Sequence, residues 1–373
     1  MDSHDIDAIV IGAGIAGATV AAHLAPDYRV ALIEAEEQAA YHTTGRSASI
    51  WILNYGPPDV RTLTGLSRTF FEHPPPGFAD AKLFRQRPAM FIAAPGQAAE
   101  MAAFRAEAAG IRIIGAAEAK TLVPALRDGA VAEASLETDA FDMDVAALHA
   151  GYLRLLRTRG GTLALRHRSA RIERRSARWE VETTTALFRA PVVVNAAGAW
   201  GDEVAAQAGL APLGLIPKRR TGCIIDPAPY VVEHWPMIGD VGNTWYARPE
   251  ARTRLMVSPA DATPMHAHDV RPDELDVATA IDRMQQALDI EVRRVEHSWA
   301  GLRTFTPDGS LAFGFAADAP GFVWCVGQGG YGIQTSPAAG RLIADMIAGR
   351  DPGPAGAILD AVDPNRFRLL NAR

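Results

Sequence analysis

The chain has 373 residues, which is too many for one compact core, and a prior of about 150 residues per domain predicts two domains. Hydrophobic residues make up 48% of the chain and charged residues 21%, as in an ordinary soluble globular protein. The formal net charge of -6 argues against a nucleic-acid-binding surface, so small molecules are the expected partners.

Cysteine usage and the N-terminus both favour a cytoplasmic protein. Cys223 and Cys325 lie in apolar runs, where a cysteine is more often a buried hydrophobe than half of a disulfide or zinc pair. The first residues lack the basic segment of a signal peptide. The uncharged stretch 8–22 is shorter than the roughly 20 residues of a spanning helix. We therefore expect no metal site and no transmembrane segment.

The start of the chain predicts a strand, a glycine-rich turn, a helix and a second strand. Residues 7–11 form a short apolar run, and Gly12-Ala-Gly-Ile-Ala-Gly17 opens an alanine-rich helix that reaches about Ala25. Residues 29–33 form the second strand, which ends at Glu34, 22 residues after the first glycine. This order and spacing are typical of a dinucleotide-binding unit.

Each glycine of this turn has a separate task in binding a dinucleotide. The three glycines allow a tight turn, close approach of the backbone to a pyrophosphate, and close packing of helix on strand. The helix N-terminus then faces the phosphate with free amide groups, and Glu34 can accept hydrogen bonds from a ribose. A glycine-rich helix start without a ligand is the alternative. We disfavour it because the strand, the helix and the acid all lie where binding needs them.

The rest of the chain alternates irregular stretches with short elements. An irregular segment that contains residues 41–56 leads to a turn with three prolines at 74–77. Helices are predicted at 98–110, 116–126, 145–159 (capped by Asp144), 276–288 and 333–348, and strands at 162–165, 179–183, 191–194 and 321–326. Strand-like pieces and prolines predominate between about 213 and 301, as in a mostly antiparallel domain inserted into the first.

Two more turns of small residues, at 195–200 and 327–332, follow predicted strands and can lie close to a ligand. An enzyme that binds only NAD would use one glycine turn. Three such turns and the extended segment 41–56 suit a longer ligand such as FAD. The predicted fold class is α/β (α+β), with a Rossmann-like FAD-binding domain and a mostly antiparallel β-sheet substrate domain. The predicted boundaries are 1–80, 145–212 and 302–373 for the first domain, and 81–144 and 213–301 for the second.

Five motifs carry a resemblance that covers residue 7 to about 348. They are "YHTTGRSA", "VVNAAGAW", "PKRR", "WAGLRTF" and "GQGGYGIQTS". Through them the sequence resembles the D-amino-acid oxidase family of flavoproteins, and within it most of all the D-arginine dehydrogenases. The resemblance implies a D-amino-acid oxidase-like fold that binds FAD in the Rossmann-like domain and places the substrate between the flavin and the second domain's sheet.

The residues expected to hold FAD combine the glycine turns with positions implied by the resemblance. They are Gly12, Gly14, Ala16, Gly17, Glu34, Ala35, Thr43, Thr44, Gly45, Arg46, Ser47, Ala48, Ser49, Ala197, Gly198, Gly329, Gly330, Tyr331, Gly332, Ile333 and Gln334. Neither cysteine falls where related enzymes attach FAD covalently, so we expect the FAD to be non-covalent.

The reaction implied by the resemblance is hydride removal from the α carbon of an amino acid to flavin N5, giving an imino acid that hydrolyses in water. Arg303 and Arg220 match the family's paired arginines, whose planar guanidinium groups fit a substrate carboxylate. On residue type alone, Arg220 would fit a solvated basic run at 218–220 better. Arg303 lies among apolar residues, where an unpaired charge is costly, which favours a functional role.

Four further residues are expected on the substrate side. Tyr55 and Tyr246 match the family's substrate-side tyrosines, although an isolated tyrosine usually belongs to a core or a rim. Gly330 and Gln334 are also expected to contact substrate. His297 is as consistent with a packed strand residue as with a catalytic one.

Two positions depart from the D-arginine dehydrogenase pattern. Ile50 replaces a substrate-side histidine, and Ala89 replaces the acid that pairs with a cationic side chain. Burying a guanidinium without a counter-charge would be costly. We therefore expect apolar D-amino acids to be better substrates than D-arginine or D-lysine. The loss of the histidine also leaves room for a slow enzyme, a secondary amine or another substrate.

The electron acceptor follows from a third position. Related sarcosine oxidases activate oxygen with a lysine, and Met256 aligns there. We therefore expect a dehydrogenase that passes electrons to a quinone or another acceptor. The alternatives are oxidation of an N-methyl amino acid or a 2-hydroxy acid, since the same arginines would hold any α carboxylate. A flavin-binding subunit of a larger complex is a further alternative, against which the two arginines argue.

Overall fold

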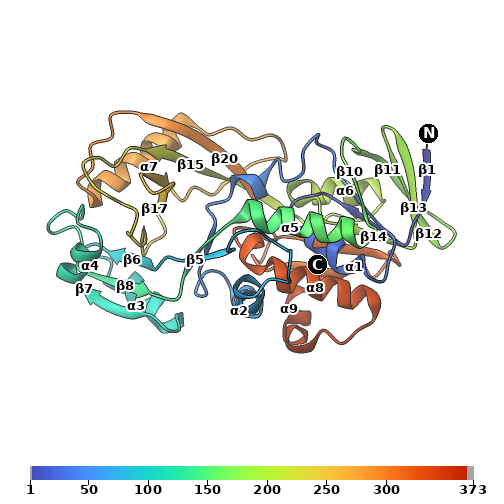
Figure 1. The fold of residues 1–373 in the computed structure, drawn as a ribbon, viewed down its shortest axis with the longest axis horizontal. Helices are drawn as coiled ribbons and strands as arrows, with labels where there is room; N and C mark the ends of the chain where they lie inside the picture. Colours follow the sequence, from blue (N-terminus) through green and yellow to red (C-terminus); the bar gives the residue numbers. More distant parts are fainter. Residues whose placement is uncertain (1, 368–373) are drawn as a thin grey trace.

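The structure, a computed structural model, describes residues 2–367 and contains two regions arranged along its long axis (Figure 1). One region holds the N-terminus and is built on a six-stranded sheet, whereas the other is built on a nine-stranded sheet. A small three-stranded sheet lies between them and consists of β4 (Ile50–Trp51), β9 (Phe141–Met143) and β5 (Phe84–Gln86).

The six-stranded sheet is parallel except at one edge, where β21 runs antiparallel to β22. Its order is β10 (Thr162–Ala164), β3 (Val30–Ile33), β2 (Ala8–Ile11), β14 (Val192–Asn195), β22 (Phe322–Val326) and β21 (Ala312–Phe315). All residues of β2, β3 and β22 are buried, as expected for parallel strands covered on both faces.

Helix α1 (Ile15–Leu24) lies at the centre of this region and packs against α5 (Val145–Thr158) and α8 (Gly332–Ala348). Its sequence IAGATVAAHL is mostly small and apolar, so neighbouring helices can approach closely on several sides. The remaining helices of this region are α2 (Pro58–Glu72), α6 (Gly201–Gln207) and α9 (Leu359–Val362). The region also carries a four-stranded sheet with the order β1 (Asp2–Asp5), β13 (Ala186–Ala190), β12 (Arg178–Thr183) and β11 (Ser169–Arg175).

The nine-stranded sheet joins segments that are far apart in the sequence. Its order is β19 (Thr263–Pro264), β15 (Ile216–Ile225), β18 (Arg254–Ser258), β17 (Tyr246–Glu250), β16 (Met237–Asp240), β6 (Ala89–Ala93), β8 (Glu133–Glu137) and β7 (Arg112–Gly115), and β20 (Val295–Phe305) also pairs with β15. Helices α3 (Ala98–Glu107), α4 (Ala116–Leu122) and α7 (Glu274–Ala287) belong to this region. The β6–β16 pairing is parallel and connects the two halves of the region.

The structure confirms the predicted strand-turn-helix-strand unit and the final glycine turn and helix. It also confirms that Asp144 caps α5, since its side chain accepts a hydrogen bond from Ala147 N. The irregular assignment of residues 57–73 was wrong, because α2 occupies them. The sequence did not indicate this helix, because threonines and a glycine interrupt its pattern. Val60, Leu63 and Phe71 form its buried face, and Pro58 is its first residue.

The predicted domain boundary between residues 301 and 302 falls inside a strand of the nine-stranded sheet. Strand β20 continues through this point because it pairs with β15 from Val295 to Phe305. It therefore runs from the substrate-side region to the glycine turn at 327–332, where Gly329 N donates to Thr304 O. This continuity brings Arg303 to the junction of the two regions.

Candidate active site

The first glycine turn is closed to side chains, as a dinucleotide-binding turn requires. Gly12 has φ +101°, and a Cβ there would lie 2.6 Å from Ala196 O. A Cβ on Gly17 would lie 1.9 Å from Gly12 O. Glu34 lies beside the turn, since its Oε2 accepts a hydrogen bond from Ala13 N at 2.8 Å. The turn, the acid and the start of the 195–200 turn therefore meet at one place.

Segment 43–46, a short 3₁₀ helix, crosses the N-terminus of α1. Thr44 Oγ1 accepts a hydrogen bond at 3.0 Å from the backbone N–H of Ile15, the first residue of α1. This is where the free amide groups and the dipole of the helix favour a pyrophosphate. The structure thus places the "YHTTGRSA" motif over the expected phosphate site.

A groove runs along these turns and contains most of the residues expected to bind FAD. The predicted residues that line it are Gly12, Gly14, Ala16, Glu34, Ala35, Thr43, Thr44, Arg46, Ser47, Ala197, Gly198, Gly329, Gly330, Gly332 and Ile333. Those that do not are Gly17, Gly45, Ala48, Ser49, Tyr331 and Gln334. The wall at His167, Arg168 and Ser169 was not predicted, because it follows β10 without a glycine signal. Tyr41, His42, Trp200 and Gln328 also line the groove; they lie in the predicted motif and turns but were not among the residues expected to bind FAD.

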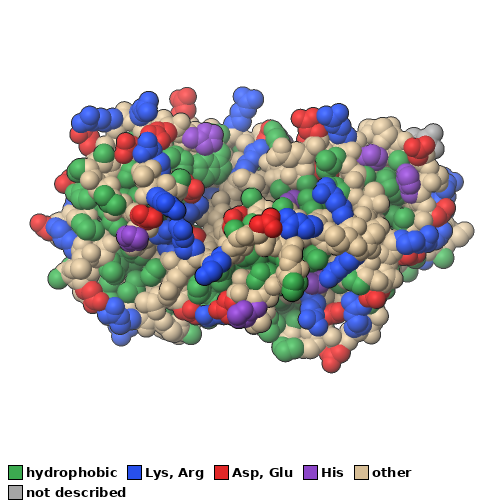
Figure 2. All heavy atoms as spheres, in the orientation of Figure 1, with side chains coloured by type: hydrophobic (Ala, Val, Ile, Leu, Met, Phe, Trp, Pro, Cys, Tyr) green, Lys and Arg blue, Asp and Glu red, His purple; other side chains and the backbone are tan. Residues whose placement is uncertain are grey.

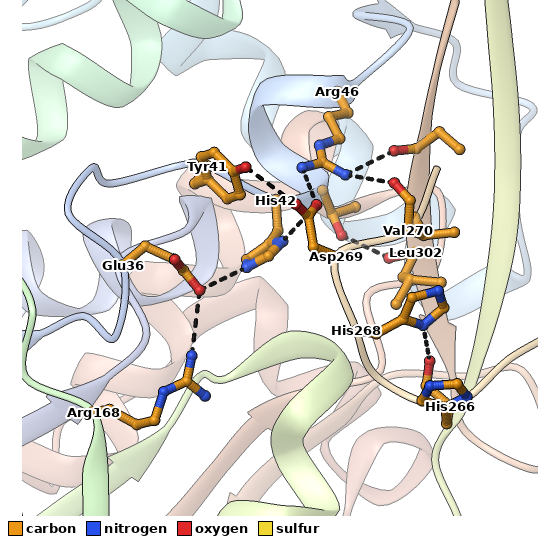
Figure 3. A network of polar contacts seen from close by, with 12 residues as sticks. Glu36, Tyr41, His42, Arg46, Arg168, His266, His268, Asp269, Val270 and Leu302 are labelled. Atoms are coloured by element: carbon orange, nitrogen blue, oxygen red, sulfur yellow. Dashed lines mark hydrogen bonds and ion pairs between the residues drawn. The ribbon is translucent and has the colours of Figure 1, made fainter. Parts of the chain in front are cut away.

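One side of the groove is tied to the other region by Arg46 and Asp269 (Figure 3). Arg46 Nη2 donates to Asp269 at 2.6 Å, and its Nη1 donates to the carbonyls of Val270 and Ala300 at 3.1 and 3.0 Å. Tyr41 Oη also donates to Asp269, at 3.1 Å. The guanidinium of Arg46 is therefore the largest cause that holds the pKa of Asp269 below its ordinary value. We name residues 266–270, which end in this anchor, the strap.

Arg303 lies on the floor of the groove with its guanidinium between two tyrosines. Its Nη1 donates to Tyr55 Oη at 3.0 Å and its Nη2 to Tyr246 Oη at 3.4 Å. Burial lowers the pKa of Arg303, but the neighbouring tyrosine oxygens outweigh burial and raise it above the ordinary value. Within residues 2–367, Arg303 forms no ion pair with a carboxylate. It therefore presents an uncompensated positive charge to the groove.

Arg220 also lines the groove and is held from behind by Asp261. Its Nε donates to the Asp261 carbonyl at 2.7 Å, and the guanidinium carbon lies 6.0 Å from the centre of the Tyr246 ring. The Asp261 carboxylate forms a long ion pair with the same Nε, at 4.0 Å, and accepts from Thr221 N at 2.6 Å, and burial raises its pKa. Burial raises the pKa of Tyr246 too, but Arg303 and Arg220 bring it below its ordinary value.

The turn that carries Tyr55 is held from both regions. From β8, the buried Glu137 carboxylate accepts from Leu53 N at 3.0 Å and from Asn54 Nδ2 at 2.8 Å. From α8, Gln334 Nε2 donates to Thr64 Oγ1 at 2.8 Å, and its Oε1 accepts from Ile52 N at 3.3 Å. Gln334 is only 2% exposed and is engaged with this turn, so it lies behind Tyr55 rather than in the groove.

Gly330 completes the contact between the last glycine turn and this site. A Cβ on Gly330 would lie 2.8 Å from Arg303 Nη1 and 2.9 Å from Tyr55 Oη. Tyr331 packs against Tyr55 with ring centroids 5.0 Å apart, and burial raises its pKa to about 12. A side chain at position 330 would therefore displace the Arg303 guanidinium or the Tyr55 hydroxyl.

An apolar cluster lies beside the two tyrosines. Ile50 and Ala89 belong to it, together with Met256 and Tyr246, although the first two come from different sheets. Ala89 is fully buried and Met256 is 2% exposed. The two positions that depart from the arginine-specific pattern thus lie in one hydrophobic cluster and do not line the groove, and a charged side chain placed in this cluster would be desolvated without a partner.

A metal-binding cluster and a cysteine are absent from this site in the described chain. Residues 2–367 contain no cluster of three or more His, Cys, Asp or Glu side chains able to hold a metal, and no helix there is long and apolar enough to cross a bilayer. Burial raises the pKa of Cys223 to about 11 and that of Cys325 to about 12, and neither lines the groove. His297 stacks on Trp299 outside the groove.

The parallel sheet and the glycine turns are those of a dinucleotide-binding protein. Residues 7–346 match the model of the FAD dependent oxidoreductase family, and the chain belongs to this family, whose members bind FAD. It is 30% identical over 168 residues to glycine oxidase of Geobacillus kaustophilus (strain HTA426), covering 45% of this chain and 43% of that protein. It is 27% identical over 209 residues to mitochondrial dimethylglycine dehydrogenase of Mus musculus, covering 51% and 23%.

The aligned segments span less than half the length of either relative. The similarity in fold covers more of the chain than these sequence alignments do. The crystal structure of glycine oxidase from Geobacillus kaustophilus matches with a TM-score of 0.82 and 22% identity, over 93% of this chain and 96% of that one. The predicted mixed α/β fold with a Rossmann-like FAD region is therefore confirmed.

Proposed function

We propose that the protein oxidises the α C–N bond of a D-amino acid to an imino acid, prefers apolar side chains, and passes the electrons to an acceptor other than oxygen. The observation that carries this proposal is the partly buried Arg303, which has two phenol partners and no carboxylate partner within residues 2–367. A substrate carboxylate would supply the missing negative charge, and the guanidinium fork would orient it bidentately.

FAD bound in the groove would supply the hydride acceptor, flavin N5. The chain's own residues would bind and orient the substrate. Arg303 and Arg220 would fix the substrate carboxylate, and the hydroxyls of Tyr55 and Tyr246 would share that hydrogen bonding. A substrate anchored there lies next to Gly330, so its α carbon is oriented by position rather than by acid-base chemistry. The positive charge of both arginines also favours the neutral amine over the ammonium form.

The side-chain preference follows from the apolar cluster. Ile50, Ala89 and Met256 belong to an apolar cluster without a counter-charge, so a leucine or phenylalanine side chain placed against this cluster would gain free energy by leaving water. A guanidinium or ammonium group would lose its hydration without compensation. Met256 also stands where related oxidases have their oxygen-activating lysine, which supports dehydrogenase activity and a separate acceptor.

The experiment is anaerobic mixing of the purified holoprotein with single amino acids while the visible absorbance of the flavin is followed. We expect bleaching by D-leucine and D-phenylalanine and little by D-arginine, with the L-enantiomers as matched controls. Slow recovery of colour in air and fast recovery with an artificial acceptor would support the dehydrogenase. Fastest bleaching by D-arginine would contradict the apolar preference, and fast recovery in air would contradict the dehydrogenase.

A secondary amine is the second candidate substrate. The dimethylglycine dehydrogenase relative acts, by its name, on an N-methylated amino acid, and the apolar Ile50 would tolerate an N-methyl group better than a histidine would. Bleaching by N-methyl amino acids but by no primary D-amino acid would select this function. Bleaching by 2-hydroxy acids alone would indicate that only the carboxylate anchor was assigned correctly.

A further inference from the structure

A second cavity, of about 810 Å³, lies beside the flavin groove. Its walls come from residues 38–49, from 82–87, from the start of α5 and from the turn after β17. Ala40, Thr44 and Ser47 line both the cavity and the groove, so segment 40–47 is their shared wall. A molecule in this cavity would be separated from the FAD groove by one segment of chain.

The cavity carries an excess of positive charge, although the protein as a whole has a formal charge of -6. Three cations are paired: Arg87 with Asp142 at 2.5 Å, Arg248 with Glu250 at 2.5 Å, and Arg252 with Glu233 at 3.6 Å. The cavity lining also includes Asp144, whose side chain accepts from Ala147 N in the cap of α5.

Two exposed cations of the cavity, Lys82 and Arg85, have neither an ion pair nor a side-chain hydrogen bond in the described chain. Figure 2 shows lysine and arginine side chains gathered over the area where β5 and β17 lie in Figure 1. Val145 and Ala146 of the first turn of α5 also line the cavity, where the Asp144 carboxylate caps the helix and offsets the positive end of its dipole. The two unpaired cations outnumber this one carboxylate, so the cavity attracts an anion.

The backbone of the cavity wall is unusual in a second, independent way. Four of its non-glycine residues have a left-handed backbone, with φ of 61° at Ala40, 62° at Ser49, 45° at Ala251 and 69° at Arg252. Such conformations cost free energy for residues with a Cβ and persist where the surroundings hold them, which is common at functional sites. Two of these residues, Ala40 and Ser49, flank the shared wall.

We propose that this cavity binds a negatively charged electron acceptor that reoxidises the enzyme. The inference rests on the proposed function, because each substrate oxidised leaves two electrons in the enzyme. One two-electron acceptor or two one-electron acceptors must take them. The cavity reaches the surface of segment 40–47 that faces away from the FAD groove. Lys82 and Arg85 steer the anion, and segment 40–47 separates it from the FAD groove.

Binding is tested first with hexacyanocobaltate(III), a redox-inert trianion, by titration calorimetry on the holoprotein. The double variant Lys82→Glu with Arg85→Glu changes two exposed residues. The control Arg293→Glu changes an exposed cation outside the cavity. We expect the wild type and the control to bind the anion, and the double variant to bind it at least tenfold more weakly. Equal binding by all three, or by none, would overturn the proposal.

Electron transfer is tested on holoprotein reduced with dithionite and then mixed with ferricyanide, so that no organic substrate is needed. Two ferricyanide ions are reduced for each flavin reoxidised. At an ionic strength of about 0.01 M the double variant should react on the order of tenfold more slowly than the control, and the difference should vanish at about 1 M. Unchanged rates at low salt would refute the acceptor site.

The same variants separate this proposal from the proposed function. If no amino acid bleaches the flavin but ferricyanide oxidation depends on Lys82 and Arg85, then the substrate assignment fails and the acceptor site stands. If the double variant instead slows bleaching by D-leucine and leaves ferricyanide oxidation unchanged, the cavity is the substrate entrance and the acceptor site is wrong.

Discussion

Arg303 is the residue on which the proposed substrate binding depends most. The substitution Arg303→Lys keeps the charge but removes the planar fork that holds two carboxylate oxygens and contacts both tyrosines. We expect KM for the best D-amino acid to rise about tenfold or more, with a smaller change in kcat. The control is Arg219→Lys, whose guanidinium pairs with Asp276 at 2.7 Å outside the groove. An unchanged KM in Arg303→Lys would contradict the carboxylate anchor.

Glu137 is expected to act on substrate through Tyr55. Burial raises the pKa of this carboxyl, so it takes up a proton as the pH falls through that raised value. It then loses one of its two acceptor contacts with Leu53 and Asn54. We therefore expect KM to rise toward acid pH in the wild type. Glu137→Gln should show the higher KM at every pH, with kcat nearly unchanged.

A double-mutant cycle with Tyr55→Phe separates this role from general destabilisation. If Glu137 acts by holding the Tyr55 turn, Glu137→Gln should add little to the KM of Tyr55→Phe. Additive effects, or a wild-type pH profile retained in Glu137→Gln, would show that Glu137 is merely structural. No sequence pattern pointed to this residue, because its partners are a backbone N–H and an amide that lie more than 80 positions away in the sequence.

The strap is the element that closes the groove from the other region. Its Asp269 bonds to Tyr41 and Arg46, which line the groove, so breaking this anchor should loosen FAD. We expect Asp269→Asn to raise the FAD dissociation rate about fivefold to tenfold, since it removes charge-assisted hydrogen bonds. The rate is measured by flavin fluorescence after dilution. The control is Asp273→Asn at the start of α7, and equal rates in both variants would contradict the anchor.

Local sequence patterns predicted the elements that depend on interactions between residues close in the sequence. The first strand-turn-helix unit and the cap of α5 depend on residues close in sequence, and both were found. Helix α2 was missed because its threonines and Gly65 are weak helix formers, and its buried face packs against α8, more than 260 residues away. The wall at 167–169 was missed for a similar reason, since only the arrangement of β10 beside β3 brings it to the groove.

The whole molecule depends on pairings between distant segments. The parallel β6–β16 contact joins residues 89–93 to 237–240, and no periodicity in either strand specifies this partner. The predicted boundaries of the two interleaved domains remain a prediction. Arg303 and Tyr55 were identified by resemblance, but their contact arises only because β20 crosses from one sheet toward the other region.

The stability of the whole chain should decline in mild acid because of His23. This side chain lies in α1 at the centre of the FAD-binding region, its Nε2 has no hydrogen-bond partner in the described chain, and burial lowers its pKa to about 4. The unfolded chain has the ordinary value of 6.5 and binds the proton more readily. The contribution of His23 is therefore fully present above pH 6.5 and is lost as the pH falls toward 4, by about 3 kcal/mol.

Urea unfolding at pH 7.5 and pH 5 measures this effect. The variant His23→Leu removes the titrating group, and we expect its loss of stability between the two pH values to be clearly smaller than that of the wild type. Some loss should remain, because burial also lowers the pKa of His149, which bonds to Ala13 O at 2.9 Å beside the glycine turn. The exposed His73→Gln serves as the control and should behave like the wild type. If His23→Leu and the wild type lose stability equally, His23 is not the acid-sensitive group.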